Sequence, residues 1–124
     1  KLFKSYNNEY NNGEQIRDFI YVNDCVSVIK WFIKNPNVSG IFNCGTGKGR
    51  SFKDLANAVF EAMDITPKIK YINMPDEIKN QYQYYTTAEM TKLKNMGYNI
   101  PFTSLENGIK DYVQNYLLRN NMYK

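Results

Sequence analysis

The sequence predicts a single mixed α/β domain over residues 1–124, rich in helices and with only a few short strands. The chain is long enough to bury one core, and 43% of its residues are apolar, which is ordinary for a folded protein. Several segments repeat apolar residues at helical spacing, between short apolar runs typical of strands. These runs are too few for a complete doubly wound sheet.

The first strand and helix are expected early in the chain. After a polar, turn-rich loop at residues 7–14, the run Asp18–Val22 (D-F-I-Y-V) predicts a short strand. Asn23 or Asp24 is then expected to cap a helix that ends near Pro36, because proline cannot continue a helix. The apolar residues of this helix share one face: Cys25, Val28, Ile29, Phe32 and Ile33.

The middle of the chain predicts strand, helix and strand. Residues Ile41–Cys44 form a short apolar run typical of a buried strand. Ser51 is a good helix cap, and apolar residues recur at helical spacing from Phe52 until the helix stops before Thr66-Pro67. Residues 68–74 alternate charged and apolar side chains, which predicts a half-exposed strand.

Two capping boxes predict the last two helices. Thr86 with Glu89, and Thr103 with Glu106, each place a hydroxyl three residues before a carboxylate, so that each side chain can bond the other residue's backbone N–H. The first helix should end at Gly97 and the second should run to the C-terminus.

A glycine-rich stretch, G-I-F-N-C-G-T-G-K-G-R-S at residues 40–51, looks like a phosphate-binding loop. The dinucleotide form would need a glycine where Arg50 stands, and the Walker form fails because Lys48 is followed by Gly49. We therefore favour a strand, a tight turn and a capped helix, with Lys48 and Arg50 in solvent.

Composition excludes several functions. The sequence has no histidine, so imidazole catalysis and histidine-ligated metals are ruled out, and we predict no metal site. Cys25 and Cys44 lack a C-x-x-C spacing and are expected to be reduced core residues. The charge of +4 is spread along the chain, and no apolar run approaches the roughly 20 residues that span a bilayer. No Tyr-x-x-x-Lys pair occurs, so the chain holds no recognisable catalytic constellation.

Five stretches occur in an order that resembles a known family: R-D-F-I-Y-V-N-D (17–24), G-I-F-N-C-G-T-G with S-F (40–52), P-D-E-I-K-N-Q-Y-Q-Y-Y-T-T-A-E (75–89), G-Y-N-I-P-F (97–102) and E-N-G-I-K-D-Y (106–112). The chain resembles the C-terminal, substrate-binding part of an extended short-chain dehydrogenase/reductase of the nucleotide-sugar epimerase family. The stretch 75–89 narrows the resemblance to the branch that acts on ADP-heptose.

The resemblance implies a cytoplasmic, NADP-dependent epimerase that inverts one alcohol of ADP-heptose, toward the heptose of lipopolysaccharide. It implies a homo-oligomer, specifically a homopentamer, with no nucleic-acid or membrane partner. The cofactor loop and the catalytic Tyr and Lys are expected in an N-terminal Rossmann portion that this chain lacks, so it contains no catalytic or cofactor-binding residue. Since the first residue is Lys1 rather than Met, we expect a fragment, inactive alone and poorly soluble.

Three residues match substrate-binding positions of the family: Phe3, Arg17 and Tyr82. A guanidinium suits a diphosphate, and a tyrosine offers both a flat face and a hydroxyl. From the residues alone, Arg17 could equally form an ion pair with Asp18, and Tyr82 is more readily a packing aromatic. After Phe3 the family's Leu-Phe-Glu-Gly-Ser loop is replaced by Lys4-Ser5-Tyr6, so the contacts of that loop are not carried over.

Two other functions stay open. One is a different extended reductase, such as a UDP-hexose 4-epimerase, which the stretch 75–89 argues against. The other is a basic binding module, for example one that binds RNA, indicated by 15% aromatic residues and a pI near 9.0. Its weakness is that most of the aromatic residues lie at core-like spacing.

Overall fold

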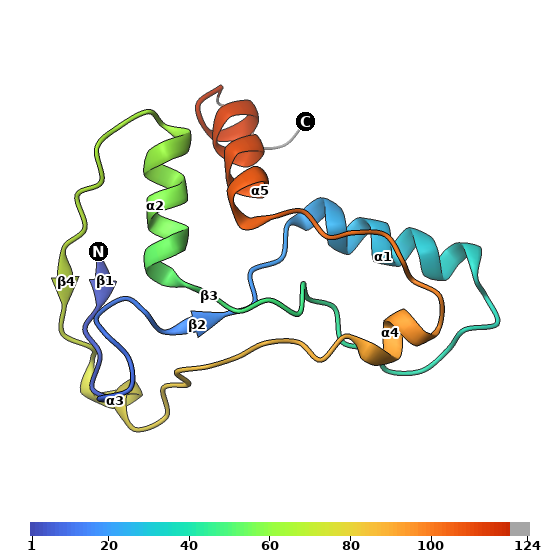
Figure 1. The fold of residues 1–124 in the computed structure, drawn as a ribbon, viewed down its shortest axis with the longest axis horizontal. Helices are drawn as coiled ribbons and strands as arrows, with labels where there is room; N and C mark the ends of the chain where they lie inside the picture. The colour runs from blue at the N-terminus through green and yellow to red at the C-terminus, as the bar shows by residue number, and fades with distance from the viewer. Residues whose placement is uncertain (120–124) are drawn as a thin grey trace.

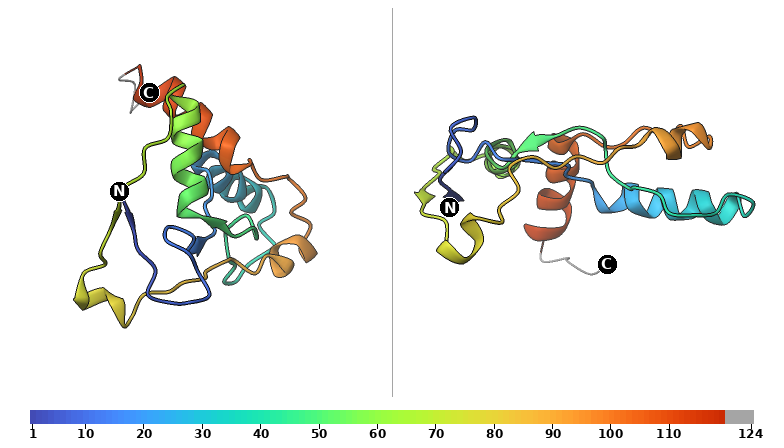
Figure 2. Two further views of the ribbon diagram at one scale, coloured as in Figure 1. Left: turned by 60° about the vertical axis from the view of Figure 1, so that its left-hand side comes forward. Right: turned by 90° about the horizontal axis from the view of Figure 1, so that it is seen from below.

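The computed structural model describes residues 1–119 as an elongated α/β molecule, helix-rich with few short strands, as predicted (Figure 1). Its elements in chain order are β1 (Leu2–Phe3), β2 (Ile16–Arg17), α1 (Val22–Lys34), β3 (Arg50–Ser51), α2 (Phe52–Ala62), β4 (Tyr71–Ile72), α3 (Asp76–Lys79), α4 (Thr91–Asn95), α5 (Leu105–Tyr112) and a π-helical segment η1 (Val113–Leu117). Helices α2 and α5 pack together near the middle, with β1, β4 and α3 at one end and α1 and α4 at the other (Figures 1 and 2).

Two strand pairs organise the backbone. β1 runs parallel to β4, with Leu2 opposite Tyr71, and the Leu2 N–H donates to the carbonyl of Lys70 (2.9 Å). β2 runs antiparallel to β3, with Arg17 directly opposite Arg50. The first pair lies at the end of the molecule that holds the N-terminus, and the second lies nearer its middle (Figure 1).

The strand predictions were largely wrong. At residues 18–22 the pairing has already stopped, and residues 41–44 form no strand, with Ile41 90% exposed. Within 68–74 only β4 pairs. An extended apolar run becomes a strand only where the backbone of a second segment offers hydrogen-bond partners, and within residues 1–119 no backbone group pairs with residues 41–44.

Helix α1 begins earlier than predicted. Its N-cap is Tyr21, which makes no side-chain capping bond, so the caps predicted at Asn23 and Asp24 are wrong. Asp24 instead lies buried in the first turn, where its carboxylate accepts hydrogen bonds from the N–H (2.8 Å) and hydroxyl (2.9 Å) of Thr103. A carboxylate in the first turn also interacts favourably with the positive end of the helix dipole. Asp24 therefore joins α1 to the segment before α5.

Helix α2 agrees with its prediction. The Ser51 hydroxyl accepts a bond from the Asp54 N–H (2.9 Å), and the Asp54 carboxylate accepts one from the Ser51 N–H (3.1 Å), which completes a capping box. The helix ends at Ala62, and Asp64 follows with a positive φ of 56°. Aspartate is one of the few residues that adopts this conformation readily.

Helix α4 is shorter than predicted. The capping box expected at residues 86–89 does not form, because the helix begins at Thr91. The Glu89 carboxylate instead accepts a bond from the Thr91 N–H (2.8 Å). The predicted end is confirmed: Gly97 follows the last turn with φ of 101°, a left-handed conformation that favours glycine.

Helix α5 is capped one residue later than predicted. Ser104 accepts from the Asn107 N–H (3.2 Å), since the Thr103 hydroxyl is engaged with Asp24. The regular helix stops at Tyr112 and continues as η1, where the prediction had one α-helix. The predicted continuation beyond residue 119 lies outside the described residues.

One buried cluster holds α1 against α4. Trp31 lies edge-on to Tyr98, with ring centroids 5.7 Å apart, and Leu93 is the most buried member of the cluster. Burying one such side chain contributes about 1.5–3 kcal/mol. The buried residues are Val28, Met90, Leu93 and Tyr98, and the partly buried ones packed on them are Trp31, Phe32, Phe42, Ala88 and Phe102.

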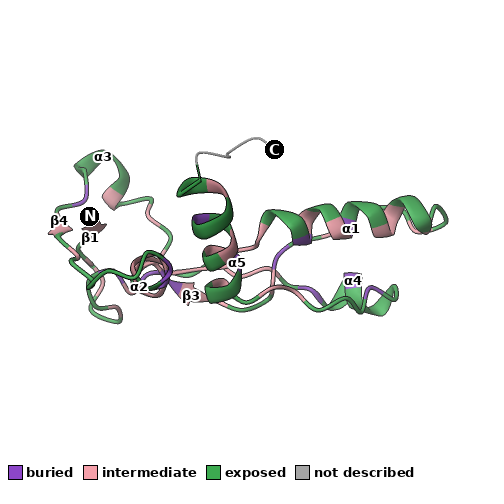
Figure 3. Ribbon diagram, turned by 90° about the horizontal axis from the view of Figure 1, so that it is seen from above, coloured by how far each residue is buried: buried purple, intermediate pink, exposed green. Residues whose placement is uncertain are grey.

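The outer face of α1 carries an apolar stripe that residues 1–119 leave uncovered (Figure 3). Its four members recur at helical spacing and are 59%, 39%, 58% and 74% exposed, in the order Val22, Val26, Ile29 and Ile33. Helices of the described chain are all too short or too polar to cross a membrane. The four side chains of the stripe together form an exposed apolar surface along α1.

Candidate functional site

The structure brings together the three residues predicted to bind substrate. The guanidinium carbon of Arg17 lies 5.2 Å from the centroid of the Tyr82 ring. The Phe3 ring meets Tyr82 edge-on, with centroids 6.3 Å apart and planes at 88°. They come from β2, from the segment after α3 and from β1, and together they set a permanent cation beside an aromatic surface.

Arg17 is held without being neutralised. Its Nη1 donates to the carbonyl of Ile16 (2.7 Å), and its guanidinium lies 5.6 Å from the Phe52 ring centroid. Among residues 1–119 it makes no ion pair, so the alternative pairing with Asp18 is not formed. Several guanidinium N–H groups therefore stay available to a ligand.

Tyr82 is half-buried between the cation and other aromatic rings. Tyr84 lies edge-on to it, 5.4 Å between centroids, so Tyr82 packs as well as facing Arg17. Burial raises the pKa of the Tyr82 hydroxyl, an effect that the positive charge of Arg17 only partly opposes. The hydroxyl thus stays protonated at neutral pH and can both donate and accept a hydrogen bond.

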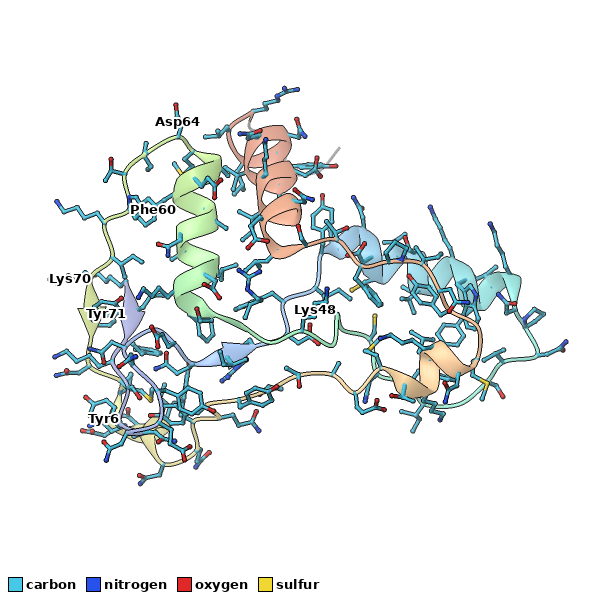
Figure 4. The ribbon with its side chains drawn as sticks, viewed as in Figure 1. Tyr6, Lys48, Phe60, Asp64, Lys70 and Tyr71 are labelled. Carbon is cyan, nitrogen blue, oxygen red and sulfur yellow. The ribbon has the colours of Figure 1, made fainter. Side chains whose placement is uncertain are left out.

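The divergent loop after Phe3 packs beside this site. The Tyr6 N–H donates to the Tyr84 hydroxyl (3.0 Å), and the rings of Tyr10 and Tyr84 lie 5.4 Å apart. The Lys79 ammonium sits 4.3 Å from the centroid of the Tyr6 ring, which joins the loop to α3 (Tyr6 is labelled in Figure 4). The replacement of Glu-Gly-Ser by Lys4-Ser5-Tyr6 therefore gives a loop anchored by aromatic contacts.

Asp18, the neighbour of Arg17, ties three segments together. Its carboxylate accepts four hydrogen bonds, from the Thr46 N–H (2.8 Å) and hydroxyl (2.5 Å), the Gly47 N–H (2.8 Å) and the Ala88 N–H (3.0 Å). Burial raises the pKa of Asp18, but these hydrogen bonds outweigh it and the pKa lies below its usual value. Sequence reasoning missed this role.

The same contacts explain the glycine-rich stretch. The N–H groups of Thr46 and Gly47, which a phosphate would need, already donate to Asp18. At Gly45 an added Cβ would lie 2.5 Å from the Ala88 Cβ and 2.6 Å from the Asp18 Oδ2, so only glycine fits. The turn and the helix after it are as predicted, and the loop does not fit the pyrophosphate of a dinucleotide.

Arg50, predicted to lie in solvent, is only partly exposed and forms two ion pairs. Its Nη2 lies 2.6 Å from the Glu106 carboxylate and its Nε 3.2 Å from that of Asp54. The hydrogen bond to Glu106 is the main cause that raises the pKa of Arg50. These ion pairs join β3 to α2 and α5, whereas Lys48 is exposed (Figure 4). Residues 1–119 contain no cluster of acidic, cysteine and histidine side chains able to hold a metal.

Comparison with known proteins shows relatives along nearly the whole chain. Residues 6–45 match the NAD dependent epimerase/dehydratase family. The chain is 50% identical over 117 residues to an ADP-L-glycero-D-manno-heptose-6-epimerase of Nitratidesulfovibrio vulgaris, covering 94% of this chain and 36% of the relative. It is 46% identical over 129 aligned positions to the enzyme of that name from Fusobacterium nucleatum, covering 99% and 39%.

A solved structure agrees with these sequences. The ADP-L-glycero-D-manno-heptose-6-epimerase of Helicobacter pylori superposes with a TM-score of 0.65 at 25% identity, over 91% of this chain and 32% of that one. The fold and sequence of this chain are similar to those of a part of the nucleotide-sugar epimerases, which are extended short-chain dehydrogenases/reductases. Among these enzymes, the chain resembles ADP-L-glycero-D-manno-heptose-6-epimerase, and it spans little more than a third of the curated relatives it matches.

Proposed function

We propose that this chain is the substrate-binding part of an ADP-L-glycero-D-manno-heptose 6-epimerase. The observation that carries the proposal is 50% and 46% identity to enzymes of that name over 94% and 99% of the chain. The whole enzyme would invert the C6″ alcohol of ADP-heptose by transient oxidation and re-reduction, in the cytoplasm, for the heptose of the lipopolysaccharide inner core. It would act as a homo-oligomer, a homopentamer in the family it resembles.

The described site supports a division of labour. The glycine-rich loop of this chain is occupied by Asp18, so NADP and the catalytic tyrosine and lysine belong to a portion that this chain does not contain. When bound there, NADP supplies the hydride chemistry. The residues of this chain bind and orient the nucleotide-sugar, and the chain alone turns over no substrate.

Each of the three candidate residues has its own role in this proposal. Arg17, which carries no ion pair within residues 1–119, donates hydrogen bonds to the diphosphate. Tyr82 offers its ring face and its protonated hydroxyl, and Phe3 supports that ring edge-on. The three residues thus hold the nucleotide end while the sugar extends toward the catalytic portion.

The test is a calorimetric titration of the 124-residue chain with ADP-glucose, as a stand-in for the ADP-heptose, and with UDP-glucose. We expect ADP-glucose to bind more tightly than UDP-glucose, and Arg17→Gln to weaken its binding by about tenfold, the loss of one charge-assisted hydrogen bond. Arg119→Gln is the matched control, because Arg119 is exposed and the charge change is the same. Equal affinity for both sugars, or equal effects of the two variants, would contradict the proposal.

A further inference from the structure

A pocket separate from the site of Phe3, Arg17 and Tyr82 lies between the loop at residues 45–50 and the segment that joins α4 to α5. Its volume is about 450 Å³, within the range of small-molecule sites. Its lining includes three cationic side chains and three aromatic rings, and none of its lining residues is an aspartate or glutamate. The six are Lys48, Arg50, Lys94, Phe19, Tyr98 and Phe102.

We propose that this pocket binds a phosphorylated small molecule, such as a nucleoside monophosphate. The positive charge comes from Lys48 and Lys94, which form no ion pair within residues 1–119, although Lys94 is near enough to the Glu89 carboxylate to help lower its pKa. Arg50 is balanced by Glu106 and Asp54, so it shapes the wall rather than supplying net charge. Two ammonium groups that line one pocket can both donate hydrogen bonds to the oxygens of the same phosphate.

The loop fixes the backbone from which Lys48 extends. The Lys48 N–H donates to the Thr46 hydroxyl (3.1 Å), and that residue is itself held by Asp18. On the opposite wall, Tyr98 is buried and its ring centroid lies 5.6 Å from that of Phe102. The pocket lining therefore combines lysine side chains with aromatic side chains, which favours a ligand that joins a phosphate to a flat, apolar group.

This site is a neighbour of the first and is distinct from it. The pocket lining contains none of Phe3, Arg17 and Tyr82. Arg17 and Arg50 are opposite each other on β2 and β3, but Arg17 lies against Tyr82 and Phe52, whereas Arg50 turns to Asp54 and Glu106. The second site therefore does not depend on the nucleotide-sugar proposal.

The test follows the backbone amide signals of Asn99 and Thr103, two pocket residues, by NMR while AMP is added to the 124-residue chain. We expect saturable shifts, which adenosine without its phosphate does not reproduce. The double variant Lys48→Gln/Lys94→Gln should weaken AMP binding at least about tenfold. Its matched control is Lys30→Gln/Lys34→Gln, two exposed lysines of α1 with the same change of charge.

Arg17→Gln separates the two sites, since it should leave the AMP shifts of Asn99 and Thr103 unchanged. The wild-type chain allows a further test. Raising the salt concentration from about 20 to about 300 mM should weaken AMP binding, because salt screens the charges of Lys48 and Lys94. Absence of shifts, equal effects of the two double variants, or loss of the shifts in Arg17→Gln would overturn the proposal. The last outcome would mean a single anion site.

Discussion

Asp18→Asn should destabilise the fold through the loop at residues 45–48. The carboxylate accepts four hydrogen bonds, three from backbone N–H groups of Thr46, Gly47 and Ala88 and one from the Thr46 hydroxyl. An asparagine keeps one acceptor oxygen, but its NH₂ group replaces the other oxygen and cannot accept the hydrogen bonds that were made to it. Two of the four bonds are lost in either orientation of the amide: those from Gly47 and Ala88 if the NH₂ replaces Oδ2, or the two from Thr46 if it replaces Oδ1.

The expected magnitude follows from these contacts. A hydrogen bond to a charged group contributes about 1.5–3 kcal/mol, and the half-buried position of Asp18 favours the lower end. Loss of two such bonds therefore lowers the free energy of unfolding by about 3–4 kcal/mol. This is a large fraction of the stability of a domain of this size.

Urea unfolding followed by the fluorescence of Trp31, the one tryptophan of the sequence, measures this change. Trp31 is suitable because it packs on Tyr98 in the buried cluster. The matched control is Asp64→Asn, since Asp64 is exposed (Figure 4) and asparagine tolerates its positive φ. A loss below about 0.5 kcal/mol in Asp18→Asn, the usual scatter of surface substitutions, would refute the reasoning.

The pH dependence gives a second test of the same contacts. The folded-state pKa of Asp18 lies below the ordinary value of 3.8, since the hydrogen bonds outweigh burial. Its stabilisation is therefore complete above that ordinary value and is lost as the pH falls through the lowered pKa. The difference in stability between wild type and Asp18→Asn should narrow from pH 7 toward pH 3. A constant difference would show that the charge is not responsible.

Two further substitutions test other features. Gly45→Ala should lower the free energy of unfolding by about 1–3 kcal/mol in the same urea assay, because its Cβ would clash with Ala88 and with Asp18; an unchanged midpoint would mean that the loop adjusts freely. The apolar stripe of α1 should make the chain associate as its concentration rises, and Ile29→Lys/Ile33→Lys should reduce this in analytical ultracentrifugation; an equal sedimentation profile for both proteins would contradict it.

The helices show how far local sequence information reaches. The apolar spacing placed α1 and α2, and the Ser51 cap was predicted because a serine directly precedes the first apolar residue of the helix, Phe52; its capping-box partner, Asp54, is only three residues away. The cap of α5 was missed by one residue because the choice between Thr103 and Ser104 depends on Asp24, which lies 79 residues before Thr103. Spacing along the chain does not show which distant carboxylate a hydroxyl will meet.

The strands and the site depend still more on distant contacts. Residues 41–44 have the composition of a buried strand, yet within residues 1–119 no segment pairs with them. Phe3, Arg17 and Tyr82 are far apart in sequence and carry no shared periodicity, so only the family resemblance predicted that they act together. For Asp18 a signal did exist, an acid beside a strand and a Gly-Thr-Gly turn later in the chain, but it does not say that the two meet.

The glycine-rich loop does bind an anion, and that anion is the protein's own Asp18. Arg17, the last residue of β2, is followed directly by Asp18, and the two would otherwise be candidates for an ion pair because a carboxylate attracts a nearby guanidinium. Four donors from elsewhere in the chain occupy Asp18, while Arg17 lies over the rings of Tyr82 and Phe52. The loop therefore engages the Asp18 carboxylate while Arg17 stays over the aromatic rings without an ion pair, and Gly45 is the residue that lets the loop approach Asp18 closely enough.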